Sequence, residues 1–302
     1  MLESHGWMQL LPNTRRRGDF PIHLRVTTTR LAWLHQHGVT QVGLEASGGY
    51  ERAITSFLRK AGIRVFVFQP VQVRGYAKFL NRKAKTDAID AQLIARCTAA
   101  SVNPRDPPDP RLLALSEIMT FLEQTEEDAV RYKTRLEGFT NPAVRKQIEK
   151  HIKALKVKRE ALLKTIHKTV ARHDDLQARL DLIVSVQGIG PRTALALLIR
   201  MPELGTLSRE EAASLVGVAP FDRQSGNHDG LRHIAGGRAR LRRSLYAAAL
   251  SAAFHHNPAL INLYQRLTKD GKTHKSALIA CVRKLVIYAN TVVARGKPWV
   301  KA

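Results

Sequence analysis

Two aspartates stand three residues apart in the segment AKTDAIDAQL (84–93), at Asp87 and Asp90. If a helix begins near Thr86, residues at positions i and i+3 share one face, so both carboxylates would project from its first turn. The same positions also have a purely structural interpretation. Asp87 could cap the helix, and Asp90 could interact with the positive end of its dipole. The spacing of the two residues leaves both interpretations open.

A third carboxylate, Glu45, ends an apolar stretch directly before the Ser-Gly-Gly run at 47–49. In α/β sheets, ligands and catalytic groups gather at strand ends and helix starts. Carboxylates brought together repel each other unless a cation lies between them, and Mg²⁺ takes oxygen ligands and pairs with phosphates. Two such ions ~3.5–4 Å apart can activate an attacking oxygen and stabilise a leaving one in phosphodiester chemistry. Glu45, Asp87 and Asp90 are therefore the candidate Mg²⁺ ligands.

Ser225 lies in the polar stretch RQSGNHDG (223–230), for which the sequence predicts an exposed loop. Serine is a weak nucleophile unless a neighbouring group removes or shields its proton. His228, Asp229 or a metal held by the carboxylates could assist, and the sequence does not choose among them. The alternative is structural, because a serine in a Gly-rich loop is commonly a turn residue.

Six arginines, interrupted by four glycines, fall within the segment from 223 to 243. A guanidinium group pairs with phosphate through a planar, bidentate fork, so the segment is a candidate for gripping a nucleic-acid backbone without reading its sequence. The alternative is an ordinary solvated basic surface. The arginines concerned are Arg223, Arg232, Arg238, Arg240, Arg242 and Arg243.

The segment GIGPR (188–192) joins two apolar helical stretches and is similar to a helix-hairpin-helix turn. Gly188 and Gly190 would let backbone amides approach a phosphate at a helix N-terminus, where Pro191 suits the first turn. A tight turn between two packed helices explains the same residues equally well.

Hydrophobic periodicity predicts the elements that would position these residues. Strands are expected at 39–46 and 63–70, and helices at 50–62 and 86–100, the alternation of an α/β unit. Prolines at 104, 107, 108 and 110 break any helix and predict a domain boundary. We therefore expect a first domain over 1–105.

Long helices follow, with a break at GFTNPAV (138–144). The arm 111–141 holds four Lys/Arg and six Asp/Glu, whereas the arm 142–172 holds ten Lys/Arg and two Glu. This pattern predicts an antiparallel helical hairpin over 111–180 with opposite charge on its arms, or two merely solvated helices. A helical domain is expected over 181–302.

The composition points to a polyanionic partner. The formal net charge is +24 and the isoelectric point about 10.7, which favours nucleic acid. No membrane contact is expected, because apolar stretches such as 193–199 and 245–254 are shorter than the ~20 residues of a membrane span. Two distant cysteines predict neither disulfides nor a zinc site, and no secretion signal is visible, which favours a reducing, intracellular setting.

Six motifs, in this order and spacing, carry a family resemblance. LEASGGYE (44–51), QPVQVRGYAK (69–78) and AKTDAIDA (84–91) resemble the RuvC-like domain of the DEDD insertion-sequence transposases, the family numbered 110 with its 1111 subgroup. SVQGIGPRTALALL (185–198), EAASLVGVAPFDRQSG (211–226) and RARLRRSLYAAALSA (238–252) resemble that family's C-terminal transposase domain.

The resemblance implies an α/β plus all-α protein: an RNase H-like (RuvC-like) domain, a helical coiled-coil insertion and a C-terminal helical transposase domain. Glu45, Asp87 and Asp90 would be the second, third and fourth members of an acidic tetrad. Ser225, before Gly226, would attack a DNA phosphate and hold the cut end covalently. The implied partners are element and target DNA, a guide RNA and further copies of the chain as dimers or tetramers, in the bacterial cytoplasm at the nucleoid.

One departure from the family pattern concerns the first aspartate, which the family carries on an opening strand in a Gly-Ile-Asp-Val-Ser-like motif. No such motif is present, and WMQLLPN (7–13) resembles what normally follows two opening strands, so the RuvC-like domain is expected to be N-terminally shortened. Two alternatives stay open. One is a nucleic-acid-binding remnant with impaired catalysis, and the other is a RuvC-type junction endonuclease, which would leave the Ser-Gly segment unexplained.

Overall fold

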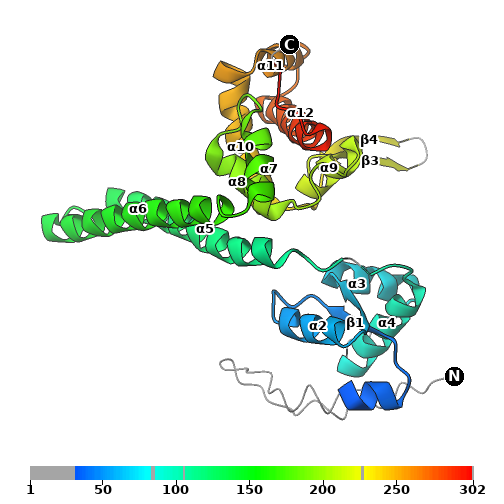
Figure 1. Cartoon of the computed structure of the whole chain (residues 1–302). Coiled ribbons are helices and arrows are strands. Elements are labelled where there is room, and N and C mark those ends of the chain that lie inside the picture. The colour runs from blue at the N-terminus through cyan, green and yellow to red at the C-terminus, as the bar shows by residue number, and fades with distance from the viewer. Residues whose placement is uncertain (1–30, 83–85, 105, 226–227, 301–302) are drawn as a thin grey trace. The chain divides into compact units, whose positions relative to one another are not determined.

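The computed structural model describes residues 31–82, 86–104, 106–225 and 228–300, without the side chains of 222–232. The chain forms two compact units, Met1–Pro107 and Pro108–Ala302 (Figure 1). The boundary between them falls in the predicted proline-rich segment. The expectation of a shortened opening strand concerns residues before 31, which lie outside the described ranges.

The N-terminal unit is built on two parallel strands, β1 (Gln41–Glu45) and β2 (Arg64–Phe68), paired in register from Gln41↔Arg64 to Glu45↔Phe68. The predicted strands and helices of this unit are present. The predicted helices correspond to α2 (Glu51–Lys60) and α4 (Asp87–Ala100), and the unit also contains α3 (Pro70–Phe79) and a helical segment at 31–36.

Alternate residues of β2 face opposite sides of the sheet, as the two-residue period of a strand requires. Val65 packs with Val42 of β1 and Leu58 of α2 in one apolar cluster. Phe66 and Phe68 pack on the other side with residues of α3 and α4. The sheet therefore has α2 on one face and α3 and α4 on the other.

The C-terminal unit begins with the predicted hairpin of two long helices, α5 (Pro110–Glu137) and α6 (Pro142–Val170). Each starts with a proline at its first helical position, preceded by Asp109 and Asn141, whose side chains accept hydrogen bonds from backbone amides of the first turn. Figure 1 shows the hairpin extending away from the remaining helices of this unit.

The remaining helices enclose one apolar core. They are α7 (Asp174–Val184), α8 (Pro191–Arg200), α9 (Arg209–Val216), α10 (Ala239–Ser251), the π-helix η2 (Ala252–His256), α11 (Pro258–Lys269) and α12 (His274–Arg295). Every residue of α8 from Thr193 to Ile199 is buried. Helix α12 is long and apolar enough by composition to cross a membrane. Leu278, Cys281 and Leu285 of α12 are fully buried in this core, which accounts for that composition.

The polar stretch after α9 is a β-hairpin, whereas the sequence predicts a loop. Strands β3 (Pro220–Ser225) and β4 (His228–Ile234) pair antiparallel, with an irregularity between Phe221 and Arg223. The prediction of a loop was wrong because PFDRQS and HDGLRHI lack the apolar alternation that identifies a half-buried strand.

Candidate active site and nucleic-acid interface

Glu45 is the last residue of β1, and a tight turn follows it. The amide of Ala46 still donates to the Phe68 carbonyl at 2.8 Å, so the sheet holds the backbone on both sides of Glu45. The turn is then closed by Glu51, whose Oε2 accepts hydrogen bonds from the Ser47 amide at 2.9 Å, the Ser47 hydroxyl at 3.0 Å and the Gly49 amide at 2.9 Å. Glu45 itself is half-buried.

Glu51 is a residue that the sequence did not identify. Its partial burial acts to raise the pKa of the carboxyl, but the hydrogen bonds from Ser47 and Gly49 outweigh this effect and hold the pKa below its ordinary value of 4.5. Its position at the first turn of α2 was the available signal, because acidic residues there can accept backbone amides. Glu51 therefore fixes the backbone directly after Glu45.

Thr86, and not Asp87, caps helix α4. The Thr86 hydroxyl accepts the Ile89 amide at 3.3 Å, so the interpretation of Asp87 as the capping residue is wrong. Asp87 is exposed and Asp90 half-buried. Among the described residues, neither carboxylate has a hydrogen bond or ion pair, and both stay available for an external ligand.

Helix α4 packs closely on β1 at Gly43. A Cβ atom added to Gly43 would lie 2.0 Å from the Thr98 hydroxyl and 2.8 Å from Ile94 Cγ2. Glu45 lies two residues after Gly43 and so belongs to the same face of the strand. Asp90 lies one helical turn before Ile94. The three carboxylates are therefore carried by two elements that are in direct contact.

The donor set suits Mg²⁺, since it consists of carboxylate oxygens only. Within the ranges that the structure describes, however, no three His, Cys, Asp or Glu side chains are grouped closely enough to hold a metal ion. The joint binding of a cation by Glu45, Asp87 and Asp90 therefore stays a prediction.

Ser225 is the last residue of β3, directly opposite His228, at the tip of the β-hairpin. Asp229 is the next residue of β4 and pairs with Gln224. The side chains of this segment, including those of Arg223 and Arg232, and residues 226–227 lie outside the described part of the chain. The nucleophilic role of Ser225 therefore stays a prediction.

Glu123 of α5 is the centre of an arginine cluster. Only 8% of this residue is exposed, and its Oε2 lies 2.6 Å from Arg200 Nη2 and 2.8 Å from Arg240 Nη1. Its Oε1 lies 3.8 Å from Arg192 Nη2. Arg192 also pairs with Glu126 at 2.9 Å. The cluster therefore ties α5 to α8 and α10 by charge.

Three other arginines of the segment 223–243, which the sequence predicts to bind phosphate, also form ion pairs or hydrogen bonds within the protein. Arg238 pairs with Glu203 at 2.6 Å and donates to the Arg200 carbonyl at 2.7 Å. Arg242 donates to the carbonyl oxygens of Val216 and Gly236, and Arg243 pairs with Glu127. The structure thus corrects the picture of a freely solvated basic segment. Arg238, Arg240 and Arg242 hold the fold together, and their contacts with phosphate stay a prediction.

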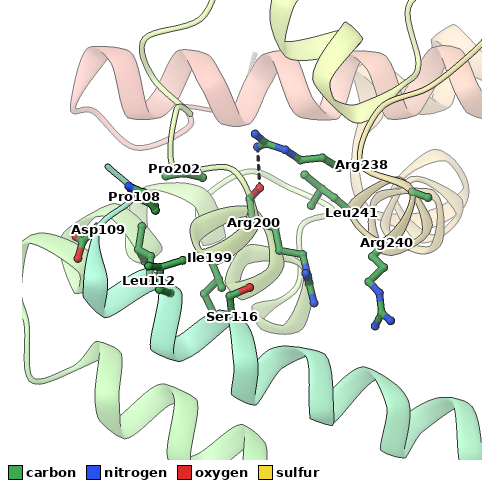
Figure 2. A pocket seen from close by; sticks show the side chains of 12 residues that line it. Pro108, Asp109, Leu112, Ser116, Ile199, Arg200, Pro202, Arg238, Arg240 and Leu241 are labelled. Atoms are coloured by element: carbon green, nitrogen blue, oxygen red, sulfur yellow. Dashed lines mark hydrogen bonds between the residues drawn. The ribbon is translucent and has the colours of Figure 1, made fainter. Parts of the chain in front are cut away.

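Arg200, Arg238 and Arg240 line a pocket of about 460 Å³ between the start of α5, the end of α8 and the start of α10. Figure 2 shows Arg238 reaching the Arg200 carbonyl at its edge, with Leu112, Ile199 and Leu241 also lining it. Its lining is mainly apolar. Arg200, Arg238 and Arg240 are committed to the pairs just described, and Asp109 pairs with Arg111 at 2.8 Å. It therefore offers no evident phosphate site.

The two glycines of the GIGPR turn differ in their surroundings. Gly188 has a φ of +94°, and a Cβ there would lie 2.3 Å from Ala252 Cβ, so this glycine allows the turn to pack against η2. Gly190 precedes α8 with open space around it. A packing role thus explains Gly188, and Gly190 remains the candidate for backbone approach to a phosphate.

Comparison with known proteins covers both units. Residues 18–141 match a family of DEDD transposases of the IS110 type, described as "Transposase", and residues 180–265 match the "Transposase IS116/IS110/IS902 family". The "Pilin gene-inverting protein" of Moraxella lacunata and that of Moraxella bovis are each 26% identical to this chain over 277 residues, which is 89% of this chain and 86% of the relative.

A shorter match is to the "Insertion element IS110 uncharacterized 43.6 kDa protein" of Streptomyces coelicolor, 34% identical over 107 residues. This match covers 34% of this chain and 26% of that protein. With both of the family's regions matched in order, the chain belongs to the IS110 family of transposases.

Proposed function

We propose that this protein cuts and rejoins DNA as the recombinase of an insertion sequence, with a carboxylate site in its N-terminal unit and a serine nucleophile in its C-terminal unit. The observation that carries the proposal is the contact between β1 and α4 at Gly43, which joins the strand that ends in Glu45 to the helix that begins with Asp87. Two relatives are named gene-inverting proteins, and the inversion of a gene requires DNA to be cut and rejoined, which supports the proposal.

The N-terminal unit is assigned to the RNase H-like fold. Its parallel strands with helices on both faces are consistent with this fold, and so is the DEDD family match. Glu45, Asp87 and Asp90 would hold Mg²⁺, which when bound polarises a phosphate and stabilises charge on its oxygens. Among the residues that the structure describes, no cationic side chain pairs with Glu45, Asp87 or Asp90, which favours this role over a structural one.

Ser225 is assigned as the nucleophile. Its hydroxyl oxygen would form a bond to the phosphorus of a DNA phosphodiester, while the bond from phosphorus to one sugar oxygen breaks and that oxygen takes a proton. The cut end would then be held as a serine phosphodiester, ready for attack by another DNA hydroxyl. The position of Ser225 in the last pair of the β3–β4 hairpin, next to its turn, supports this assignment.

The remaining assignments concern partners and organisation. Arg223, Arg232 and the turn at Gly190 are proposed to contact phosphates, and a guide RNA is proposed to select the DNA. A dimer or tetramer would supply the several sites needed to cut two duplexes. The functional division into a RuvC-like domain (1–105), a helical insertion (111–180) and a transposase domain (181–302) belongs to the same proposal.

A strand-transfer assay with element-end DNA, candidate guide RNA and Mg²⁺ tests the proposal. Ser225→Ala should abolish both recombination and covalent attachment of protein to DNA, and Asp87→Asn should reduce both at least a hundredfold. Ser276→Ala is the matched control, because Ser276 is exposed near the start of α12 and belongs to neither site.

Full activity of Ser225→Ala would refute the serine assignment, and full activity of Asp87→Asn would refute the carboxylate assignment. If the wild-type protein binds DNA but neither cuts nor attaches to it, the alternative of a catalytically impaired nucleic-acid-binding remnant is correct. Junctions cut without covalent attachment would favour the endonuclease.

A further inference from the structure

Five lysines form a stripe on the outer face of α6. At 3.6 residues per turn they fall within an arc of about 60°. The packed face of the helix, marked by buried Ile152, Ile166 and Val170, lies on the opposite side. Val157 and Glu160 also fall on this outer face. The lysine stripe consists of Lys146, Lys150, Lys153, Lys164 and Lys168, all exposed.

The charge of this stripe is not neutralised by the neighbouring helix. The sequence favours opposite charges that attract across the hairpin, but one ion pair, Arg159 with Glu126 at 3.1 Å, joins the two arms within the described residues. Glu123 and Glu127 of α5 pair instead with arginines of α8 and α10. Glu123 and Glu127 are therefore turned towards the other helices of their unit and not towards the stripe.

The lysines themselves have no acidic partner in the part of the chain that the structure describes. Across the described ranges, none of the five ammonium groups takes part in an ion pair or hydrogen bond, and α6 contributes only Glu149 and Glu160 as acids. Exposed like charges on one face repel each other, so an unpaired row of this length requires counterions or a polyanion.

We propose that the lysine stripe of α6 binds the phosphate backbone of double-stranded DNA without reading its sequence. From Lys146 to Lys168 the stripe is about 33 Å long at ~1.5 Å per residue. One turn of duplex DNA measures about 34–36 Å. A straight helix touches a twisted backbone only where the strands cross it. Two groups of lysines, separated by Val157 and Glu160, suit two such crossings.

The choice of DNA as the ligand rests on the proposed function, since an IS110-family transposase acts on DNA. Lysine supports a backbone contact and not base recognition, because its ammonium group is a compact point charge without the fork of arginine. A membrane surface is disfavoured, because the outer face of α6 presents an isolated valine and no apolar stripe.

Salt-dependent binding to a random-sequence duplex tests the proposal. The triple variant Lys146→Gln, Lys150→Gln, Lys153→Gln removes one group of the stripe. Lys269→Gln, Lys272→Gln, Lys275→Gln is the control, with the same loss of charge at exposed lysines around the turn between α11 and α12. Glutamine is as good a helix former as lysine, and thermal unfolding checks that both variants fold. Both triple variants and their parent carry Asp87→Asn, and binding is measured in EDTA, so that no DNA is cut. The measured affinities therefore do not depend on whether the proposed catalytic residues are correct.

Each phosphate contact contributes about 0.9 to the slope of log affinity against log salt. The stripe variant loses three contacts and should lower that slope by about 2.7, so that between 50 and 200 mM salt the parent loses about 40-fold more affinity than the variant. The control should keep the parent slope. Equal slopes for parent and stripe variant, or equal changes in both triple variants, would overturn the proposal. So would an effect confined to a matched RNA duplex.

Discussion

Glu123 is the residue on which the docking of α5 against α8 and α10 depends. Replacing it with glutamine leaves Arg200 and Arg240 beside a neutral amide in place of a carboxylate. Only 15% of the Arg200 side chain is exposed. Removing one partner of a buried ion pair typically costs about 3–5 kcal/mol. We expect Glu123→Gln to lower the free energy of unfolding by about 3 kcal/mol in urea titrations.

Glu127→Gln is the matched control for this measurement. Its partner Arg243 has 71% of its side chain exposed, and such surface pairs contribute about 0–1 kcal/mol. A loss for Glu123→Gln as small as that for Glu127→Gln would show that the arginine cluster does not hold the helices together.

Glu51 predicts a pH effect on the turn after Glu45. Its pKa is lowered in the folded chain, so the ionised carboxylate stabilises the fold above its unfolded value of about 4.5. This contribution should be lost as the pH falls below 4.5 and through the folded pKa. The difference in unfolding free energy between wild type and Glu51→Gln should therefore be constant from pH 7 to 5 and shrink towards pH 3. A difference that grows as the pH falls would show that folding raises the pKa of Glu51 and does not lower it.

At the scale of single residues, the sequence located the carboxylates but not their surroundings. The spacing of Asp87 and Asp90 correctly placed them at a helix start, yet Thr86 supplies the cap. Glu51 was overlooked because its role depends on a three-residue turn that only the folded backbone defines. Local spacing predicts a face of a helix, whereas hydrogen-bond partners depend on geometry between neighbouring segments.

The packing of α4 on β1 is the element-scale feature that aligns the candidate ligands. An alanine at Gly43 would press on Thr98 and Ile94, and overpacking of this kind typically costs about 1–3 kcal/mol. We expect Gly43→Ala to destabilise the protein by that amount and to lower strand transfer more than tenfold, because α4 must move with Asp90. Unfolding and strand-transfer assays measure the two effects.

The double variant Gly43→Ala, Thr98→Ala should recover part of both losses, since it removes the nearest obstructing atom. Gly75→Ala in α3 is the control, because a Cβ there meets no atom within 4 Å and alanine favours the helix by roughly 0.5–1 kcal/mol. A Gly43→Ala protein with wild-type stability and activity would show that close packing here is unnecessary.

Element prediction worked where periodicity was strong and failed where it was absent. The strands β1 and β2 and the long helices have apolar residues at the spacing typical of their type, and this spacing is visible in the sequence. The β3–β4 hairpin is polar on both sides of its turn, so only backbone pairing reveals it. Its strands place Ser225 at a hairpin tip and not in the predicted open loop.

Across the molecule, the basic side chains fall into two groups, those paired with acids inside the fold and those exposed on the surface. The net charge of +24 correctly indicated a polyanionic class of partner, as the transposase family implies. It did not indicate which lysine and arginine side chains are left without an acidic partner inside the protein. Arg200, Arg238 and Arg240 are paired within the C-terminal unit, whereas the lysine stripe of α6 has no partner among the described residues. Pairs between residues 77 and 117 positions apart, such as Arg200 and Arg240 with Glu123, are set by tertiary packing and leave no trace in local spacing.

Mn²⁺ binding followed by electron paramagnetic resonance tests directly whether Glu45 and the two aspartates of α4 hold a divalent cation. The wild-type chain should bind Mn²⁺ at least tenfold more tightly than Asp90→Asn or Glu45→Gln. The affinity is measured with and without duplex DNA, and Mn²⁺ bound by DNA alone is subtracted. Asp106→Asn, at an exposed aspartate of the same unit, should match wild type. Equal Mn²⁺ affinity in all four proteins would contradict the carboxylate site.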